Sequence, residues 1–481
     1  MRKTSGIKDR YGMTISASSP LATQRWLEGV DLLLSQNYGP EEKFQQALEA
    51  DEGFALAHAG LAYMLMLQGQ AEEARKSAQN AVALARGITR REQQQIQAIE
   101  LFVSGNGPQS LALIREHLAE FPRDALLMRL AQRLFMLGCS GAGVPDFPEE
   151  LLALLKAVER DCGDDWAFLG QYAFAHHETG FMSEAMELAQ RSLDQYPTNA
   201  VASHSVTHVF FERGEPSEGG DFLGNWLTGF DSRAPYRVHL SWHLALFELA
   251  LGRYQQVFDL YEKDIRPSVI ARSATSLADS ASLMWRLQMY GGAPPPKPWE
   301  EVRDQAAPAA SRPGPAFRDA HAALAFAASG DKEAMSGLVS RLRNEAEKGN
   351  LLAREVTLPL AQGIAAFAQG NYSEASLLLE PLYPQLTRIG GSHAQREVFE
   401  DTLLEAYLRA EQFDKAEAML RARLKQRASI RDTFWLGRAQ AGEGQAEAAR
   451  ASLDKALQGW QQADSSMPEL ANLKHVAAKV G

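Results

Sequence analysis

The chain has 481 residues, of which 45% are hydrophobic and 23% charged, so its composition is that of a folded protein rather than a disordered one. Its formal net charge of −11 has the wrong sign for long-range attraction to nucleic acid or to anionic membranes, and we expect neither as a partner. The sequence holds no apolar run long enough to span a membrane and only two cysteines, so we expect a cytoplasmic protein with reduced thiols.

Helix-forming residues dominate along the whole chain. Ala, Leu, Glu and Gln are abundant, and the alternating β-branched runs that mark strands are nearly absent, which predicts an all-α fold. Six glycines each follow a helix-forming stretch at the position of a turn, and Ala or Gly precedes each of them by seven residues. These turn glycines are Gly69, Gly180, Gly252, Gly330, Gly370 and Gly444.

The spacing around these turns is that of the tetratricopeptide repeat. The small residue before each turn lets two helices approach closely, and an alanine five residues after four of the turns gives the second helix a matching contact. Because one helical pair is too small to bury its apolar face alone, neighbouring pairs must stack. We therefore predict a tetratricopeptide-repeat-like α-solenoid, a right-handed superhelix of helical hairpins, that spans residues 1–481 as one array. Unrelated helical domains that share Ala-rich turns are the alternative.

Two stretches rich in glycine and proline interrupt the predicted array. Residues 138–148 read GCSGAGVPDFP, and residues 291–315 include GGAPPPKPWE and PAASRPGP. A helix does not tolerate this density of glycine and proline, so we predict loops near 138–148 and 291–315. Weaker repeat units lie near Gly214, near Gly252 and near Glu411, the last of which takes the place of a turn glycine.

Several patches go beyond the generic repeat. The most specific are HSVTHVFFERGEPSEG at 204–219, HLSWHLALFELALGRYQQVFDLYEKDIRPS at 239–268 and GGSHAQREVF at 390–399. With these patches, and with looser ones in order along nearly the whole chain, the sequence resembles the tetratricopeptide repeat protein thirty-eight family. The resemblance implies a helical-repeat superhelix, and it implies no particular reaction or ligand.

Histidines recur at helical spacing in the middle of the chain. His204 and His208 are four residues apart, as are His239 and His243, so each pair projects from one face of a helix. In peptide-binding tetratricopeptide arrays, first-helix side chains at these distances from the turn line the concave groove. The same repeat frame places further residues on this surface, namely Glu212 and His321.

Two other polar residues are candidates for the same pocket. Asp279 and Arg286 lie seven residues apart on one face of a predicted helix, where they form an ion pair or contact a ligand. Arg396 follows the glycine pair of GGSHAQREVF, so we expect its guanidinium to reach back into the groove as an anion clamp, with a surface salt bridge as the alternative. His393 stands in the same loop and is not included among the predicted site residues.

A concave surface lined by imidazoles and carboxylates has three interpretations. Neutral imidazoles bind zinc and other divalent metals, so a divalent metal is a candidate cofactor. Its candidate ligands are His204, His208, His239 and His243. Histidine also titrates near neutral pH, and Glu212 can orient one ring, which suits acid–base chemistry on a bound molecule. The third interpretation is that the rings only form structural hydrogen bonds.

The sequence lacks an HExxH helix, a Walker loop, a dinucleotide-binding GxGxxG and a GxSxG elbow. It therefore predicts a protein that binds a small molecule or a short peptide in a concave, His-lined pocket. An enzyme that uses the four histidines for acid–base or metal-assisted chemistry is the alternative. A protein-interaction scaffold without chemistry is the second alternative.

Overall fold

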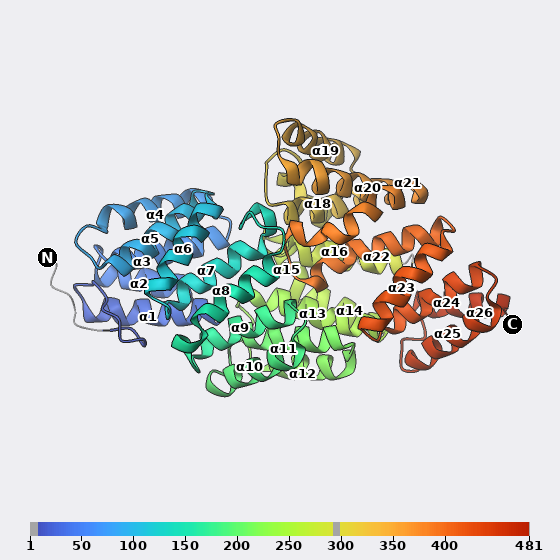
Figure 1. Cartoon of the computed structure of the whole chain (residues 1–481), viewed down its shortest axis with the longest axis horizontal. Coiled ribbons are helices and arrows are strands. Elements are labelled where there is room, and N and C mark those ends of the chain that lie inside the picture. Colours follow the sequence, from blue (N-terminus) through green and yellow to red (C-terminus); the bar gives the residue numbers. More distant parts are fainter. Residues whose placement is uncertain (1–7, 292–298, 481) are drawn as a thin grey trace. The chain divides into compact units, whose positions relative to one another are not determined.

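The structure of the chain is a computed structural model that describes residues 8–291 and 299–480. The elements of this described part are helices, and its one β-type pairing is an isolated bridge between Lys8 and Thr14 (Figure 1). The predicted all-α fold is therefore confirmed. None of the described helices combines the length and the apolar character needed to cross a membrane.

Two compact units make up the chain. One comprises the residues up to 206 together with 229–237, and the other comprises 207–228 and the residues from 238 onward. The helices of the first unit are α1 (Pro20–Leu34), α2 (Pro40–Ala50), α3 (Ala55–Leu67), α4 (Ala71–Leu84), α5 (Arg90–Val103), α6 (Gly107–Glu120), α7 (Ala125–Met136), α8 (Phe147–Cys162), α9 (Trp166–Glu178) and α10 (Met182–Gln195). The single array over residues 1–481 stays a prediction.

The second unit is also built of helices, most of them paired. Two helices, α11 (Ala200–Arg213) and α13 (Tyr236–Ala250), begin in the first unit and continue into the second. The others are α12 (Pro216–Thr228), α14 (Tyr254–Leu260), α15 (Arg266–Ile270), α16 (Leu277–Gly291), α17 (Glu300–Ala306), α18 (Ala316–Ser329), α19 (Lys332–Glu347), α20 (Leu358–Ala368), α21 (Tyr372–Leu379), α22 (His393–Arg409), α23 (Phe413–Gln426), α24 (Ile430–Gly442), α25 (Ala446–Gly459) and α26 (Pro468–Val480).

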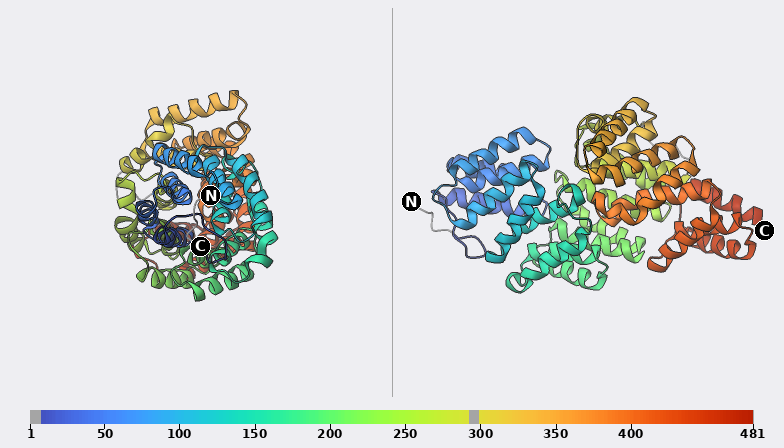
Figure 2. Two further views of the ribbon diagram at one scale, coloured as in Figure 1. Left: turned by 90° about the vertical axis from the view of Figure 1, so that its left-hand side faces the viewer. Right: turned by 45° about the horizontal axis from the view of Figure 1, so that its top comes forward.

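The six predicted turn glycines all lie between successive helices. Five of these helix pairs, α3–α4, α9–α10, α18–α19, α20–α21 and α24–α25, pack together as hairpins of the kind seen in Figure 2. Their φ angles fall between 71° and 88°, a left-handed conformation that glycine adopts without steric cost. At the weaker unit, Glu411 joins α22 to α23 with a φ of 58°. A residue with a Cβ atom therefore occupies a left-handed conformation there, which strains the local backbone. The turn positions and the tetratricopeptide-repeat-like hairpins are therefore confirmed.

Small residues let the two helices of a hairpin approach closely, as the repeat spacing predicts. A Cβ atom at Gly363 of α20 would lie 2.6 Å from Cδ2 of Leu379 on α21. A Cβ atom at Gly437 of α24 would lie 2.8 Å from Cδ2 of Leu453 on α25. Both distances are shorter than van der Waals contact, so a larger residue at either position would push the two helices apart.

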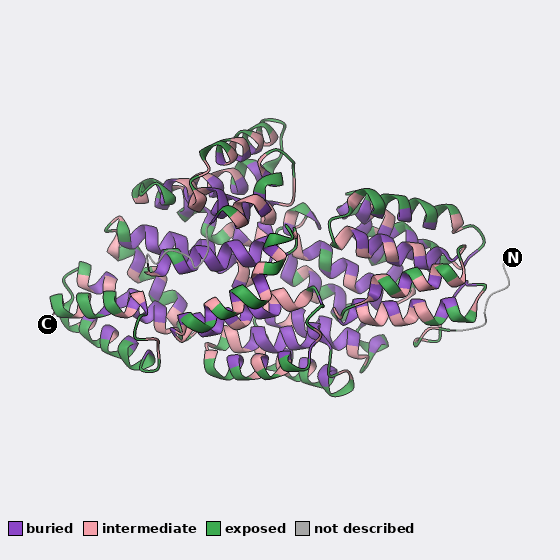
Figure 3. Ribbon diagram, turned by 180° about the vertical axis from the view of Figure 1, so that it is seen from behind, coloured by how far each residue is buried: buried purple, intermediate pink, exposed green. Residues whose placement is uncertain are grey.

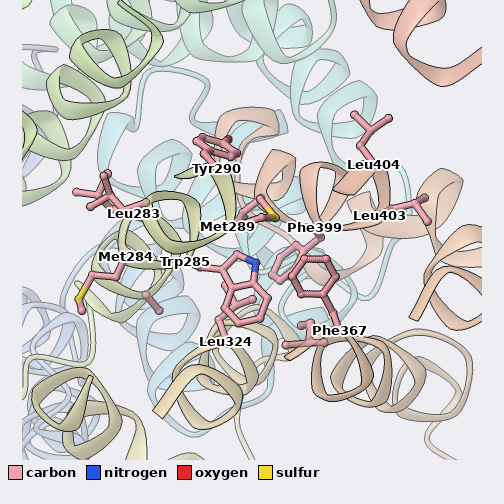
Figure 4. Packing of buried hydrophobic residues seen from close by; sticks show 14 of the residues in the cluster. Leu283, Met284, Trp285, Met289, Tyr290, Leu324, Phe367, Phe399, Leu403 and Leu404 are labelled. Atoms are coloured by element: carbon pink, nitrogen blue, oxygen red, sulfur yellow. The ribbon is translucent and has the colours of Figure 1, made fainter. Parts of the chain in front are cut away.

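Each unit has its own hydrophobic core. In the second unit, the indole of Trp285 packs among aromatic and aliphatic side chains of the surrounding helices, with Phe367 and Phe399 beside it (Figure 4). Its Nε1–H donates to the hydroxyl of Thr402 at 2.9 Å. Helices α16 and α22 pack against each other and are buried along most of their length, while the outer helices of the hairpins expose one face (Figure 3). Polar side chains on α16 and α22 therefore lie inside the protein.

The predicted loops agree with the structure in part. Between α7 and α8 the chain forms a short 3₁₀ turn, Gly138–Ser140, followed by irregular backbone. In the second stretch, residues 292–298 lie outside the described residues, and α17 and a 3₁₀ turn, Ala307–Ala310, occupy part of what was expected to be a loop. Pro308 is tolerated because it stands in the first turn of that 3₁₀ segment, where its missing amide has no partner to lose.

Candidate ligand site

Four helices that lie wholly or partly in the second unit carry a group of polar side chains, most of them buried or half-buried and that of His393 37% exposed. These helices are α11, α13, α16 and α22, and each of them contributes at least two members of the group. The residues are His208, Glu212, His239, His243, Asp279, Arg286, His393, Gln395 and Arg396. A polar group of this size inside a helical-repeat core is costly unless its members satisfy one another, so the contacts of each residue matter.

His239 is oriented by a buried carboxylate. Its Nδ1–H donates to Asp279, with distances of 3.0 Å to Oδ1 and 3.1 Å to Oδ2. The side-chain amide of Gln395, on α22, lies 3.5 Å from Oδ1 of the same aspartate. The Asp279 side chain, on α16, is only 4% exposed. Its carboxylate therefore holds the His239 ring, on α13, in one orientation.

Three imidazoles meet edge to face. The ring centroid of His243 lies 4.6 Å from that of His208 and 4.7 Å from that of His239, with interplanar angles of 72° and 79°. A ring nitrogen of His208 and one of His243 lie within 4.8 Å of each other. Burial, and then the charges of nearby cationic groups, hold the pKa of His208 well below its ordinary value, so this ring is neutral at pH 7. We call His208, His239, His243 and Asp279 the histidine cluster.

Glu212 and His393 form a second pair beside this cluster. The His393 Nδ1–H donates to both carboxylate oxygens of Glu212, at 2.8 Å and 3.0 Å, and its Nε2 lies 3.8 Å from Glu400. Burial opposes ionisation, but the Glu212 charge and hydrogen bond outweigh it and raise the pKa of His393 to about 9. The same contact lowers the pKa of Glu212 despite its burial, so the two residues form an ion pair between α11 and α22.

His393 is the residue that sequence reasoning left out. Its partner is 181 positions away in the chain, and the sequence contains no signal that links the two residues. Ser392, immediately before it, is the N-cap of α22 in a capping box with Gln395, which fixes where the His393 side chain leaves the helix. A capping signal of this kind predicts where the helix begins, and it does not predict which residue His393 contacts.

His321 lies apart from the ring-to-ring contacts of the cluster. Its Nδ1–H donates to the carbonyl of Phe317 at 2.7 Å, one turn earlier on α18, and its ring contacts the rings of Phe317 and Phe399. Burial lowers its pKa to about 4, so this histidine is neutral. The charges of Asp279 and Arg286, on α16, also act on this ring.

Arg286 and Arg396 contact the chain differently from what the sequence suggested. Asp279 pairs with His239, whereas Arg286 donates through Nη2 to the carbonyl of Ala394 at 3.0 Å, so the expected Asp279–Arg286 pair does not form. Arg396 is 7% exposed, so it is buried rather than on the surface, and it donates to the carbonyl of Gly391 in its own turn. Seven residues span nearly two helical turns, so Asp279 and Arg286 reach different neighbours along α16.

His204 belongs to the first unit. It lies one turn before His208 on α11, ahead of the boundary between the units. Its ring is 6.0 Å from that of Phe174, in a stacked arrangement, and 5.5 Å from that of Tyr236. The candidate site of the second unit therefore contains three of the four histidines that the sequence pattern groups together.

The arrangement combines groups that suit ligand recognition. A neutral buried imidazole accepts a hydrogen bond or a proton, an imidazole held by a carboxylate has a fixed orientation, and a charged imidazole donates. The second unit places all three types next to one another, in His208, His239 and His393.

Comparisons with known proteins concern the fold. No family model matches the sequence. A tetratricopeptide repeat protein from Parabacteroides merdae is similar over 66% of this chain and 99% of its own, at 12% identity and a TM-score of 0.29. The human IFIT1 dimer with m7Gppp-AAAA is similar over 92% of this chain and 96% of its own, at 14% identity and a TM-score of 0.37. An IFIT1 monomeric mutant with Gppp-AAAA matches over 94% and 98%, at 13% identity and a TM-score of 0.37.

The resemblance to the tetratricopeptide repeat protein thirty-eight family rests on the sequence patches alone. What the hairpins of the structure establish is the coarser class: the chain is an all-α protein of tetratricopeptide-repeat-like helical hairpins.

Proposed function

We propose that this helical-repeat protein binds a small molecule or a short peptide at the histidine cluster of its second unit. The observation that carries the proposal is the meeting of the rings of His208, His239 and His243 inside the second unit, with His239 oriented by Asp279. Stacked hairpins need only apolar contacts between neighbours, so the fold does not require this polar group. Titratable residues that converge in a protein interior are the usual mark of a binding site.

The protonation states of the histidines determine which hydrogen-bonding groups a ligand needs in order to bind here. The neutral ring of His208 is an acceptor for a hydroxyl, an amide N–H or a protonated amine of the ligand. Beside the cluster, the positive charge of His393 is already matched by Glu212, and within it Asp279 already supplies a carboxylate to His239. A polar ligand that donates hydrogen bonds therefore fits this site better than a phosphate or another strong anion does.

Native mass spectrometry of the purified full-length chain tests this function. We expect the wild-type protein to retain an added mass that is released on denaturation, and we expect the variant His208→Gln to lose it. The control is His475→Gln, which makes the same change on an exposed histidine of α26 and should retain the mass. Equal retention by all three proteins, or no added mass in any preparation from cells or extracts, would contradict the proposal.

Acid–base catalysis is the second candidate, and the opposite pKa shifts favour it. His208 is held neutral and His393 is held protonated in one neighbourhood, which is how protein sites separate a proton acceptor from a proton donor. If this candidate holds, the molecule released from the protein is chemically altered after incubation with the wild-type chain and unaltered after incubation with His208→Gln. Recovery of the same, unaltered molecule from both incubations would show that the protein binds this molecule without catalysing a reaction on it.

A divalent metal is the third possibility and remains a prediction. Nitrogen atoms of His208 and His243 within 4.8 Å of each other are close enough to bind one ion after a small adjustment. Protein zinc sites use three or four protein ligands, and these two nitrogens supply part of such a set. Elemental analysis of the purified protein decides the point, because a bound metal would appear in stoichiometric amount and would be lost in His243→Gln.

A further inference from the structure

The second unit contains a cavity of about 460 Å³, and none of the residues of the histidine cluster lines it. Its wall comes from six segments of the chain, namely the α11–α12 turn, the helices α13, α16 and α22, the α23–α24 connection and the helix α25. This volume is within the range of small-molecule sites in proteins. The lining residues therefore indicate what kind of molecule fits.

Much of the cavity wall is apolar. Leu246, Phe247 and Leu249 of α13 line the cavity and are buried. Phe210 and Phe211 of α11 line it as well and are half-buried. Apolar surface that faces water favours an apolar ligand, because binding removes that surface from water.

The polar part of the wall consists of ion pairs that form within the protein. Arg423 donates to Asp432 at 2.9 Å and to Asp401 at 2.8 Å. Arg427 donates through Nη2 to Glu397. The carboxylates of the wall are therefore engaged by its arginines.

The two other arginines of the wall also stand beside carboxylates. Arg431 donates through Nε to Glu469 at 2.6 Å. Nε of Arg286 lies 3.8 Å from Asp401, in the network of ion pairs that contains Arg423. Neither arginine therefore needs a counter-ion from the cavity.

The charges of the described residues that line the cavity cancel. Three of the arginines share one network with three carboxylates, and the fourth is paired with Glu469. The remaining charged residues of the wall, Glu215 and Lys455, are of opposite sign. An ion that entered the cavity would give up hydration and would find its counter-charges already engaged, whereas a neutral molecule avoids this cost.

Ser429, the N-cap residue of α24, provides a hydrogen-bonding group at the same wall. The residue lines the cavity and is half-buried. Its hydroxyl accepts from the amide of Asp432 at 3.1 Å, and its own hydrogen is donated to none of the described residues. A hydroxyl or carbonyl oxygen of a ligand can accept this hydrogen.

We propose that this cavity binds a small neutral molecule that has an apolar body and one hydroxyl or carbonyl oxygen. The apolar body would lie along Phe210 and Leu246, and the oxygen would accept from the hydroxyl of Ser429. This site is separate from the histidine cluster and does not depend on ligand binding there.

Isothermal titration calorimetry on the full-length chain at pH 7 tests the charge of the ligand. The probes are octan-1-ol, octanoate and octylammonium, which share one alkyl body and differ in charge. We expect saturable binding of octan-1-ol with one site per chain. The two ions should bind at least about tenfold more weakly, because the protein's own ion pairs already engage the charges that would balance them.

Two substitutions of Ser429 test the hydrogen bond to the ligand. Ser429→Ala should weaken the binding of octan-1-ol by about three- to tenfold, because the hydroxyl donor is lost. Ser429→Thr keeps both a hydroxyl and a residue suited to the N-cap, so it should bind octan-1-ol with nearly the wild-type affinity.

A pair of phenylalanine variants tests whether octan-1-ol occupies this cavity. Phe210 and Phe258 are both half-buried in the second unit, but only Phe210 lines the cavity. Phe210→Ala should weaken octan-1-ol binding by about fivefold or more, and Phe258→Ala should leave it unchanged. Melting temperatures check that both variants fold. If Phe210→Ala does not fold, the three probes and the Ser429 variants still decide the question.

The results that would overturn the proposal are specific. Absence of octan-1-ol binding, or equal or tighter binding of either ion, would exclude a site for a neutral molecule. Equal affinities of Ser429→Ala and Ser429→Thr would exclude the hydrogen bond, and equal weakening by the two phenylalanine variants would exclude the cavity. His208→Gln should leave octan-1-ol binding unchanged, and Ser429→Ala should leave the mass retained at the histidine cluster unchanged, so the two proposals fail separately.

Discussion

His208 and His393 lie in one unit of the same protein with opposite shifts in pKa, and each shift has a different physical cause. Burial keeps His208 neutral, whereas the carboxylate of Glu212 keeps His393 protonated in spite of burial. Because the two pKa values move apart, the protein holds an acceptor and a donor at neutral pH without any change in fold.

The dependence of stability on pH follows from the direction of the His393 shift. Its pKa rises from 6.5 in the unfolded chain to about 9 in the folded protein, so the ion pair stabilises the fold fully below pH 6.5 and is lost as the pH rises through 9. We expect the melting temperature of the wild type to exceed that of His393→Gln at pH 6 and the difference to shrink towards pH 9.5. A difference that stays constant over this range would show that Glu212 does not hold a proton on His393.

At the residue scale, part of the candidate site could be predicted from the sequence. The four-residue spacing of His239 and His243, and the positions of His208 and Glu212 six and two residues before Gly214, place these side chains on helices, and the structure brings the rings of His208, His239 and His243 into contact. The partners of Glu212 and Arg286 are missing from the prediction because those contacts join residues more than 100 positions apart. Spacing within a helix predicts which face a side chain occupies, and it carries no information about the distant helix that packs on that face.

At the scale of the helical hairpin, the turn glycines differ in what a side chain would meet. Gly69 has a φ of 82°, and a Cβ atom there would have no atom within 4 Å. Gly214, between α11 and α12, has a φ of 70°, and a Cβ atom there would lie 2.2 Å from the carbonyl oxygen of Ala428. The first glycine is required only by the backbone conformation, whereas the second is also required by the close approach of the α23–α24 connection.

Alanine substitutions separate these two requirements. We expect Gly69→Ala to lower the free energy of unfolding by about 1 kcal/mol, which is the cost of a left-handed conformation with a Cβ atom. Gly214→Ala should cost more, because the connection near Ala428 must also move. Urea denaturation of the two variants measures the difference, and equal losses would show that the contact at Gly214 relaxes freely.

The elements themselves were predictable because the repeat is local in sequence. A glycine at the turn and a small residue seven positions earlier determine a hairpin within about thirty residues, and the structure has these hairpins where the pattern predicts them. The helical segment Glu300–Ala306 lies in the stretch that the sequence predicts as a loop because of its prolines, but Pro308 comes only after the last residue of this helix. Helix-forming residues between prolines form a short helix when the prolines stand at its ends.

At the scale of the whole molecule, the chain is an all-α protein of tetratricopeptide-repeat-like hairpins in which the second unit has buried polar groups at two places. One is the histidine cluster, which the sequence indicated through its spacing. The other is a cavity lined in part by Arg286, Arg423, Arg427 and Arg431, which the sequence did not indicate, because its wall is assembled from six separate segments of the chain. Composition and spacing predict the fold class, whereas a cavity depends on how distant segments pack.

The most direct test of the central claim, that the histidine cluster binds a ligand, is to measure unfolding free energy and ligand retention together on His208→Gln and His243→Gln. Glutamine keeps the polarity and approximate size of histidine but cannot take up a proton near neutral pH. A binding site predicts that both variants lose the retained molecule in native mass spectrometry while their unfolding free energies remain close to that of the wild type. A loss of about 1–3 kcal/mol in stability with unchanged retention in both variants would contradict the account and would show that the cluster is a structural hydrogen-bonding group.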